Sequence, residues 1–155
     1  MLDDMTNLQS LLKDPSLLAT QGYLAGEWVD GEGGATFPVR NPARGDVVAN
    51  VADFTRAQTA DAIAKAEIAQ KSWAARTGKE RANILRRWYD LMMENADDLA
   101  TILTAEQGKP LAESKGEIGY GASFIEFFAE EAKRIYGETI PGHQPDKRIT
   151  VIKQP

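Results

Sequence analysis

A break between Gly108 and Pro110 is the sequence feature that most constrains how this chain can fold. Glycine readily takes the left-handed conformation that follows a helix C-terminus, and proline suits the first turn of the next helix. After the break, apolar residues recur at spacings of three and four as far as Tyr136. The sequence therefore predicts a long helix over residues 110–136, with a core-facing side made of Ile118, Ala122, Ile125, Ala129, Ala132 and Tyr136.

The same predicted helix carries aromatic bulk on a neighbouring face, at Tyr120, Phe124, Phe127 and Phe128. Its apolar surface is therefore wider than one core contact requires. Glycine in a helix interior costs about 1 kcal/mol relative to alanine, which favours close approach by another backbone or a ligand. Such glycines are Gly116, Gly119 and Gly121. Two interpretations stay open: a helix buried between two layers, and an aromatic face that partly lines a substrate passage.

The residues before the helices predict a small β region. Residues 23–29 read as one strand, residues 36–40 as its partner across the loop DGEGG, and residues 47–51 as a third strand after a turn at residues 41–46. Together they predict a three-stranded meander. Residues 6–13 predict a short amphipathic helix that ends before Pro15, and we interpret it as a docking arm.

Three further helices are predicted between the meander and Gly108. Thr55 with Gln58, and Thr77 with Glu80, have the spacing of a capping box, and Asn95 can cap the third helix. The residues expected to face the core are Ile63, Ala66, Ala69 and Trp73, then Ile84, Leu85, Trp88, Leu91 and Met92, then Leu99, Ile102 and Leu103. The cluster of Arg81, Arg86 and Arg87 is interpreted as a solvated face.

The last part of the chain predicts a turn-rich segment over residues 137–144 and a strand over residues 148–153. The strand has no evident pairing partner in the sequence, so we expect it to promote association. His143 is the single histidine and is expected to be an exposed loop residue rather than a metal ligand.

Composition bounds the function. A chain of 155 residues with 43% hydrophobic content can form one domain with a core. The absence of cysteine excludes a thiol nucleophile, and a net charge of −5 argues against a nucleic-acid partner. Asp3 and Asp4 occupy the region where a signal peptide is basic, and no run of about 18 apolar residues is present, so we expect a cytoplasmic protein without membrane contact.

Three segments carry a resemblance to a known family. The runs EQGKP, GEIGYGASFIEFFAEEAKRIYGETIP and RITVIKQP resemble the N-terminal part of aldehyde dehydrogenases, most specifically the bacterial NADP-type succinate-semialdehyde branch, and the likeness extends from about residue 22 onward. The resemblance implies an α/β fold of which this chain is the N-terminal part. It divides the chain into an arm (1–21), part of the nucleotide-binding domain (22–137) and the first bridging strands of a homo-oligomer, such as a tetramer (138–155).

For function, the resemblance implies oxidation of succinate semialdehyde to succinate with NAD or NADP, through a cysteine thiolate that lies beyond these residues. We therefore expect no catalytic, cofactor-binding or metal residue in this segment and no activity from it alone. The resemblance places Tyr120, Phe124 and Phe128 in the aldehyde-entry tunnel. Two alternatives stay open: a dehydrogenase for glutarate semialdehyde or another aldehyde, and a stand-alone helical interaction module.

Overall fold

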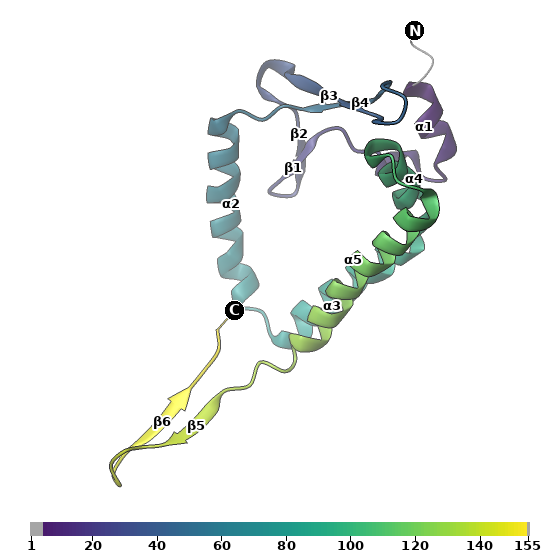
Figure 1. Ribbon diagram of the computed structural model, residues 1–155. Helices are drawn as coiled ribbons and strands as arrows, with labels where there is room; N and C mark the ends of the chain where they lie inside the picture. Colours follow the sequence, from purple (N-terminus) through teal and green to yellow (C-terminus); the bar gives the residue numbers. More distant parts are fainter. Residues whose placement is uncertain (1–4, 155) are drawn as a thin grey trace.

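The structure is a computed structural model that describes residues 5–154. Residues 1–4 of the predicted arm and Pro155 of the predicted terminal segment lie outside this range. Figure 1 shows α2 on one side, α3, α4 and α5 together on the other, and a β ribbon projecting beyond them. The elements are α1 (Met5–Leu11), a 3₁₀ turn (Pro15–Leu17), β1 (Gly22–Leu24), β2 (Glu27–Val29), a second 3₁₀ turn (Glu32–Gly34), β3 (Thr36–Arg40), β4 (Val47–Ala52), α2 (Arg56–Ala74), α3 (Gly78–Glu94), α4 (Ala96–Gln107), α5 (Leu111–Glu131), β5 (Glu138–Pro141) and β6 (Arg148–Val151).

The predicted three-stranded meander is wrong. Ala25 and Gly26 adopt positive φ values of 53° and 95°, so the chain reverses inside the predicted first strand and β1 pairs with β2. Positive φ at both central residues is the geometry of a tight hairpin turn. β3 pairs with β4 instead, with Phe37 opposite Val51, and the DGEGG loop contains the second 3₁₀ turn. The region is therefore two separate hairpins.

Both predicted capping boxes are confirmed. At the start of α2, the Thr55 side chain accepts a hydrogen bond from the Gln58 backbone N–H, and the Gln58 side-chain oxygen accepts one from the Thr55 N–H, both at 3.2 Å. At the start of α3, the Glu80 carboxylate accepts from the Thr77 N–H at 2.7 Å. These bonds satisfy backbone donors that no helical carbonyl can reach. Local sequence alone therefore determines where α2 and α3 begin.

The capping box of α3 makes stability depend on pH. Hydrogen bonds from the Thr77 hydroxyl and backbone N–H hold the pKa of the Glu80 carboxyl below its ordinary value. A lowered folded-state pKa gives a contribution that is present above the unfolded pKa of about 4.3 and is lost as the pH falls through the folded value. We expect Glu80→Gln to flatten the loss of stability between about pH 5 and pH 3. Unfolding midpoints of the wild type, Glu80→Gln and the control Glu67→Gln on exposed α2, measured over that range, test this. The same dependence of the midpoint on pH in all three proteins would contradict it.

The predicted cap at Asn95 is wrong, whereas the helix stop at Gly108 is confirmed. The Asn95 side-chain amide donates to the Leu91 carbonyl at 2.9 Å, so it closes the end of α3, and it makes no side-chain cap for α4. Gly108 ends α4 in the left-handed conformation with φ of 78°. A β-carbon there would also lie 2.7 Å from a Pro42 side-chain atom. Glycine is required at this position for both reasons.

α5 packs against α3 and α4 through small side chains. Ser114 and Ala122 are 0% exposed and Ala129 is 2% exposed, which allows the helix backbones to approach closely. The helix ends at Glu131, five residues before the predicted end. Lys133 donates its backbone N–H to the Glu130 carbonyl, which tightens the last turn. Tyr136 is 71% exposed, so its predicted place on the core face is wrong.

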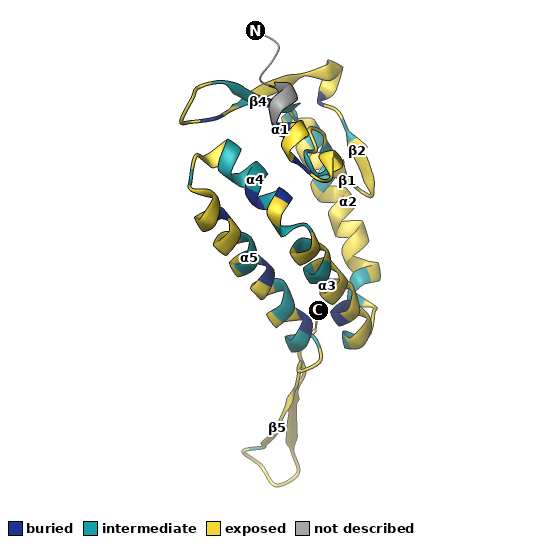
Figure 2. Ribbon diagram, turned by 90° about the vertical axis from the view of Figure 1, so that its right-hand side faces the viewer, coloured by how far each residue is buried: buried dark blue, intermediate teal, exposed yellow. Residues whose placement is uncertain are grey.

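The described residues do not form one closed core. Their buried apolar side chains are mostly small, whereas Ile63 and Trp88, both predicted to be core, are 67% and 55% exposed. Ala66 and Ala69 are exposed as well, and Figure 2 shows α2 exposed along most of its length. The accessible surface is 11144 Å². A closed monomer of this mass exposes about 7,700 Å². The helices therefore present apolar faces that this chain does not cover.

The predicted docking arm is held by a buried carboxylate. Leu8 and Leu12 are each 7% exposed, where α1 and the residues after it meet α4 and β4. Asp98 on α4 is 5% exposed and accepts hydrogen bonds from the backbone N–H groups of Lys13 at 3.0 Å and Asp14 at 2.8 Å. Hydrogen bonds to a charged acceptor are stronger than neutral ones. Asp98 therefore holds the end of α1, and with it the predicted arm, against α4.

Asp98→Ala is expected to release this arm and to lower the free energy of unfolding by about 1.5 to 3 kcal/mol, because two part-buried N–H groups lose a charged acceptor. Asp97→Ala is the matched control, since Asp97 is adjacent, its side chain is 57% exposed, and its pairs with Lys13 and Lys115 are on the surface. Such pairs contribute less than about 1 kcal/mol. Hydrogen exchange at Lys13 and Asp14, with urea denaturation, tests this; equal effects of the two changes would contradict it.

The predicted lack of a partner for the terminal strand is also wrong. β6 pairs antiparallel with β5, with Ile140 opposite Ile149 and Thr139 opposite Thr150. β5 lies inside the segment predicted to be turns, where Pro141 masked the strand pattern. All residues of the two strands are exposed, and Figure 1 shows the ribbon projecting beyond the helices. His143 is exposed in the loop between them, as predicted.

Candidate functional site

The candidate site is a line of aromatic side chains on α5, which we call the aromatic row: Tyr120, Phe124 and Phe128. The three positions are four residues apart, so each lies about 6 Å further along the same helix face. The rings of Tyr120 and Phe124 are 4.8 Å apart and meet edge to face at 77°. The structure thus brings the first two predicted tunnel residues into direct contact.

Phe128 makes its ring contact with Phe127 rather than with Phe124. These two rings are 5.3 Å apart at 84°. Tyr120, Phe124, Phe127 and Phe128 are 66%, 47%, 58% and 57% exposed. An exposed apolar patch of this kind marks a ligand or protein contact. The row and Phe127 therefore form one apolar surface with two edge-to-face pairs.

The opposite side of α5 holds the aromatic row in place. Ala122 and Ala129 are buried in the helix packing, so the backbone that carries the row cannot shift freely. Between the helices, Arg86 of α3 forms an ion pair with Glu126 of α5 at 3.2 Å. This pair is half exposed and adds little stability, so the buried alanine contacts rather than the ion pair hold α5 in place.

No other part of the described chain approaches the α5 glycines closely, so the backbone alternative of that prediction is wrong. A β-carbon built at Gly116, Gly119 or Gly121 would meet no atom within 4 Å. These positions lie in open space next to the exposed aromatic side chains. Within the described residues, the packing of α5 gives no reason for glycine there.

The chemistry available at the aromatic row is binding rather than bond making. Its side chains offer apolar faces and one phenol, which can orient a ligand and exclude water. The described residues contain no cluster of three histidine, aspartate or glutamate side chains placed to hold a metal ion. None of the helices described is long and apolar enough to cross a membrane.

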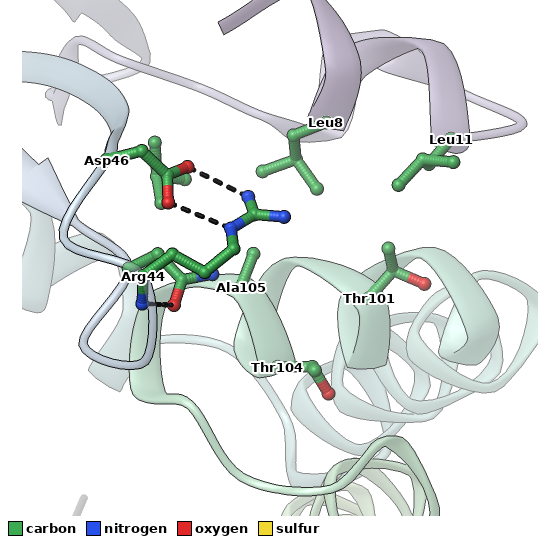
Figure 3. Close-up of a pocket in the computed structure, with 9 residues that line it drawn as sticks. Leu8, Leu11, Arg44, Asp46, Thr101, Thr104 and Ala105 are labelled. Atoms are coloured by element: carbon green, nitrogen blue, oxygen red, sulfur yellow. Dashed lines mark hydrogen bonds and ion pairs between the residues drawn. The ribbon is translucent and has the colours of Figure 1, made fainter. Parts of the chain in front are cut away.

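Sequence reasoning did not identify a cavity of about 190 Å³ between α1, α4 and the turn after β3. Figure 3 shows Arg44 and Asp46 at its edge, joined by two hydrogen bonds of 2.8 Å, with Leu8, Leu11 and Ala105 around the space. The bond from Arg44 holds the pKa of Asp46 below its ordinary value. The only sequence signal was the turn at residues 41–46. The lining of this small cavity is mixed: apolar side chains of Leu8, Leu11, Val48 and Ala105, and polar ones of Asn41, Arg44, Asp46, Thr101 and Thr104.

Comparison with known proteins identifies the family. Residues 28–155 match the aldehyde dehydrogenase family. Glutarate-semialdehyde dehydrogenase of Pseudomonas aeruginosa is 61% identical over 93% of this chain and 30% of that protein. The NADP(+) succinate-semialdehyde dehydrogenase of Escherichia coli K12 is 57% identical over 93% of this chain and 30% of that protein.

A solved structure has the same fold. The crystal structure of an aldehyde dehydrogenase from Brucella melitensis biovar abortus 2308 aligns with a TM-score of 0.89 and 55% identity, over 91% of this chain and 29% of that one. The chain thus spans about 30% of the length of the curated relatives that it matches. The matched part is their N-terminal portion. The chain therefore belongs to the aldehyde dehydrogenase family.

Proposed function

We propose that this chain is the N-terminal part of an NAD(P)-dependent dehydrogenase that oxidises a semialdehyde, with succinate semialdehyde as the substrate and glutarate semialdehyde as the alternative. The supporting observation is the identity of 57% and 61% to enzymes named for these two substrates, over 93% of the chain. Both named substrates are short aldehydes that carry a carboxylate at the other end. NADP is the cofactor in the printed name of the E. coli relative.

The part of the reaction assigned to this chain is substrate guidance. The sequence contains no cysteine, so the thiolate chemistry expected of the family falls to residues outside these 155. The aromatic row lies on a well-packed helix with its rings exposed, which suits the wall of a passage for the aldehyde. In this proposal, residues 1–21 are an arm, residues 22–137 belong to the nucleotide-binding domain, and the exposed β5–β6 ribbon joins subunits of a homo-oligomer.

The proposal is tested on the complete protein that contains this chain. Reduction of NAD and NADP should be faster with succinate or glutarate semialdehyde than with an uncharged aldehyde of similar length. The 155-residue polypeptide, purified free of host dehydrogenases, should show no reduction above a buffer blank. A complete protein that prefers the uncharged aldehyde would refute the proposed substrate class. Turnover by the 155-residue polypeptide would refute the assignment of the chemical step to residues outside it.

Phe124→Ala in the complete enzyme tests the passage. We expect the ratio of kcat/KM between a long and a short aldehyde to change by about tenfold or more, because a hydrophobic wall contact discriminates at roughly this level. Phe127→Ala is the matched control, since Phe127 is on the same patch but off the row. A loss of about 3 to 5 kcal/mol of stability with unchanged kinetics would instead make Phe124 a core residue.

A further inference from the structure

A second cavity, distinct from the aromatic row, lies where α3 begins and α5 ends. Its volume is about 430 Å³, and its lining residues are Gly78, Lys79, Arg81, Ala132, Lys133, Ile135 and Lys153. Figure 1 shows the end of the chain returning beside the junction of α2 and α3, and Lys153 of this last segment is one of the lining residues. Four of the seven lining residues are cationic and none is acidic.

Arg81 is the buried member of this lining. It is 8% exposed, and within the described residues its guanidinium group donates one hydrogen bond, from Nη1 to the Arg76 carbonyl. No carboxylate of the described residues lies within ion-pair distance of it. A guanidinium has five N–H donors, and a buried charge is normally paired with an opposite charge. The predicted solvated face is therefore wrong for Arg81, although Arg86 and Arg87 do have exposed side chains.

The acidic side chains near the cavity are already engaged. Glu80 accepts hydrogen bonds from Thr77, and Glu131 pairs with Arg134 at 2.7 Å. Glu130 lies 3.3 Å from Lys133, but this pair is about half exposed, so an incoming anion can compete for the lysine. The carboxylates around the cavity thus leave its positive charge largely unneutralised.

The backbone contributes charges of both signs. The N-terminus of α3 carries positive partial charge, which favours anions. The C-terminal carbonyls of α5 carry negative partial charge, and Ala132 O lies so close to Gly78 that a β-carbon there would be 2.4 Å from it. This close contact explains why residue 78 is a glycine. The positive charge of the four cationic side chains is larger than the negative partial charge of these carbonyls.

We infer that this cavity is a binding site for a small oxyanion of the phosphate or carboxylate class. Arg81 provides fixed N–H donors at its base, and Lys79, Lys133 and Lys153 provide mobile positive charge at its rim. Planar guanidinium groups suit both anions, and lysine contributes point charge to either. The site involves no residue of the aromatic row, so it goes beyond the proposed function.

Isothermal titration calorimetry of the complete protein that contains this chain tests the site, with inorganic phosphate and succinate as probes at low salt. We expect saturable binding that weakens as sodium chloride rises from about 0.05 M to about 0.5 M, because salt screens exposed charge. Lys79→Gln combined with Lys133→Gln should raise the Kd at least about tenfold, the factor that corresponds to 1.4 kcal/mol. Lys65→Gln is the matched control, since Lys65 pairs with Asp61 on α2, and should change the Kd less than about twofold.

The two probes identify the preferred anion. Binding of phosphate alone assigns the site to phosphate groups, and binding of both assigns it to oxyanions in general. Arg81→Lys keeps the charge but removes the planar guanidinium and its fixed N–H donors. It should weaken binding while circular dichroism shows an unchanged fold. A folded chain that binds neither probe up to about 10 mM, or equal weakening by the Lys65 control, would overturn the proposal.

Discussion

Ala122→Phe is expected to lower the free energy of unfolding by about 3 kcal/mol or more. Ala122 is 0% exposed on the side of α5 that packs against α3 and α4. The contact has no room for a ring, so the helices must separate or the ring must leave its preferred rotamer. Separation would also expose Ser114 and Thr104, whose hydroxyls are 2.8 Å apart between α4 and α5. The expected loss is therefore a large fraction of the stability of a domain this size.

Urea denaturation followed by circular dichroism measures this effect. Ser123→Phe is the matched control, because Ser123 is the next residue on the same helix and its side chain is exposed. The control should cost less than about 1 kcal/mol, as is usual for surface changes. Similar costs for the two variants would show that α5 does not pack on α3 and α4 through this face.

Self-association of the 155-residue polypeptide at micromolar concentration is the second expected result. Phe124, Phe127 and Phe128 form a continuous apolar surface on α5, and each is 47% exposed or more. Apolar patches of several hundred Å² drive association when nothing covers them. The projecting β5–β6 ribbon adds strand edges with free backbone groups. Both surfaces are available to a second copy of the chain.

Analytical ultracentrifugation tests this result with two sets of variants. Changing Phe124, Phe127 and Phe128 to glutamine should shift the population strongly toward monomer, and removal of the residues after Tyr136 should reduce only the ribbon-mediated part. Tyr23→Gln with Trp28→Gln is the control, since these rings pair at 5.1 Å on the β1–β2 hairpin and are also exposed. A wild-type chain that is monomeric and binds no hydrophobic dye would contradict the prediction and favour the interaction-module alternative.

The sequence by itself determined the local features of this protein. The starts of α2 and α3 depend on a threonine and the residue three positions later, and the end of α4 depends on Gly108. These signals act over a few residues and need no distant partner, so they could be predicted. The spacing of Tyr120 and Phe124 likewise fixed their common face once the helix was assigned. The family resemblance also came from the sequence, and the comparisons confirmed it.

Only the tertiary structure decided the pairing of strands and the burial of particular side chains. An apolar stripe indicates that a helix has a face to bury, but not whether this chain supplies the partner, which is why Ile63 and Trp88 were misassigned to the core. Strand pairing depends on where the chain reverses, and the reversal at Ala25 lay inside an apparent strand. The oxyanion cavity joins Lys79, Lys133 and Lys153 across long stretches of sequence. Such residues have no shared pattern along the chain, because only the packing of α3 against α5 and the return of the chain after β6 bring them together.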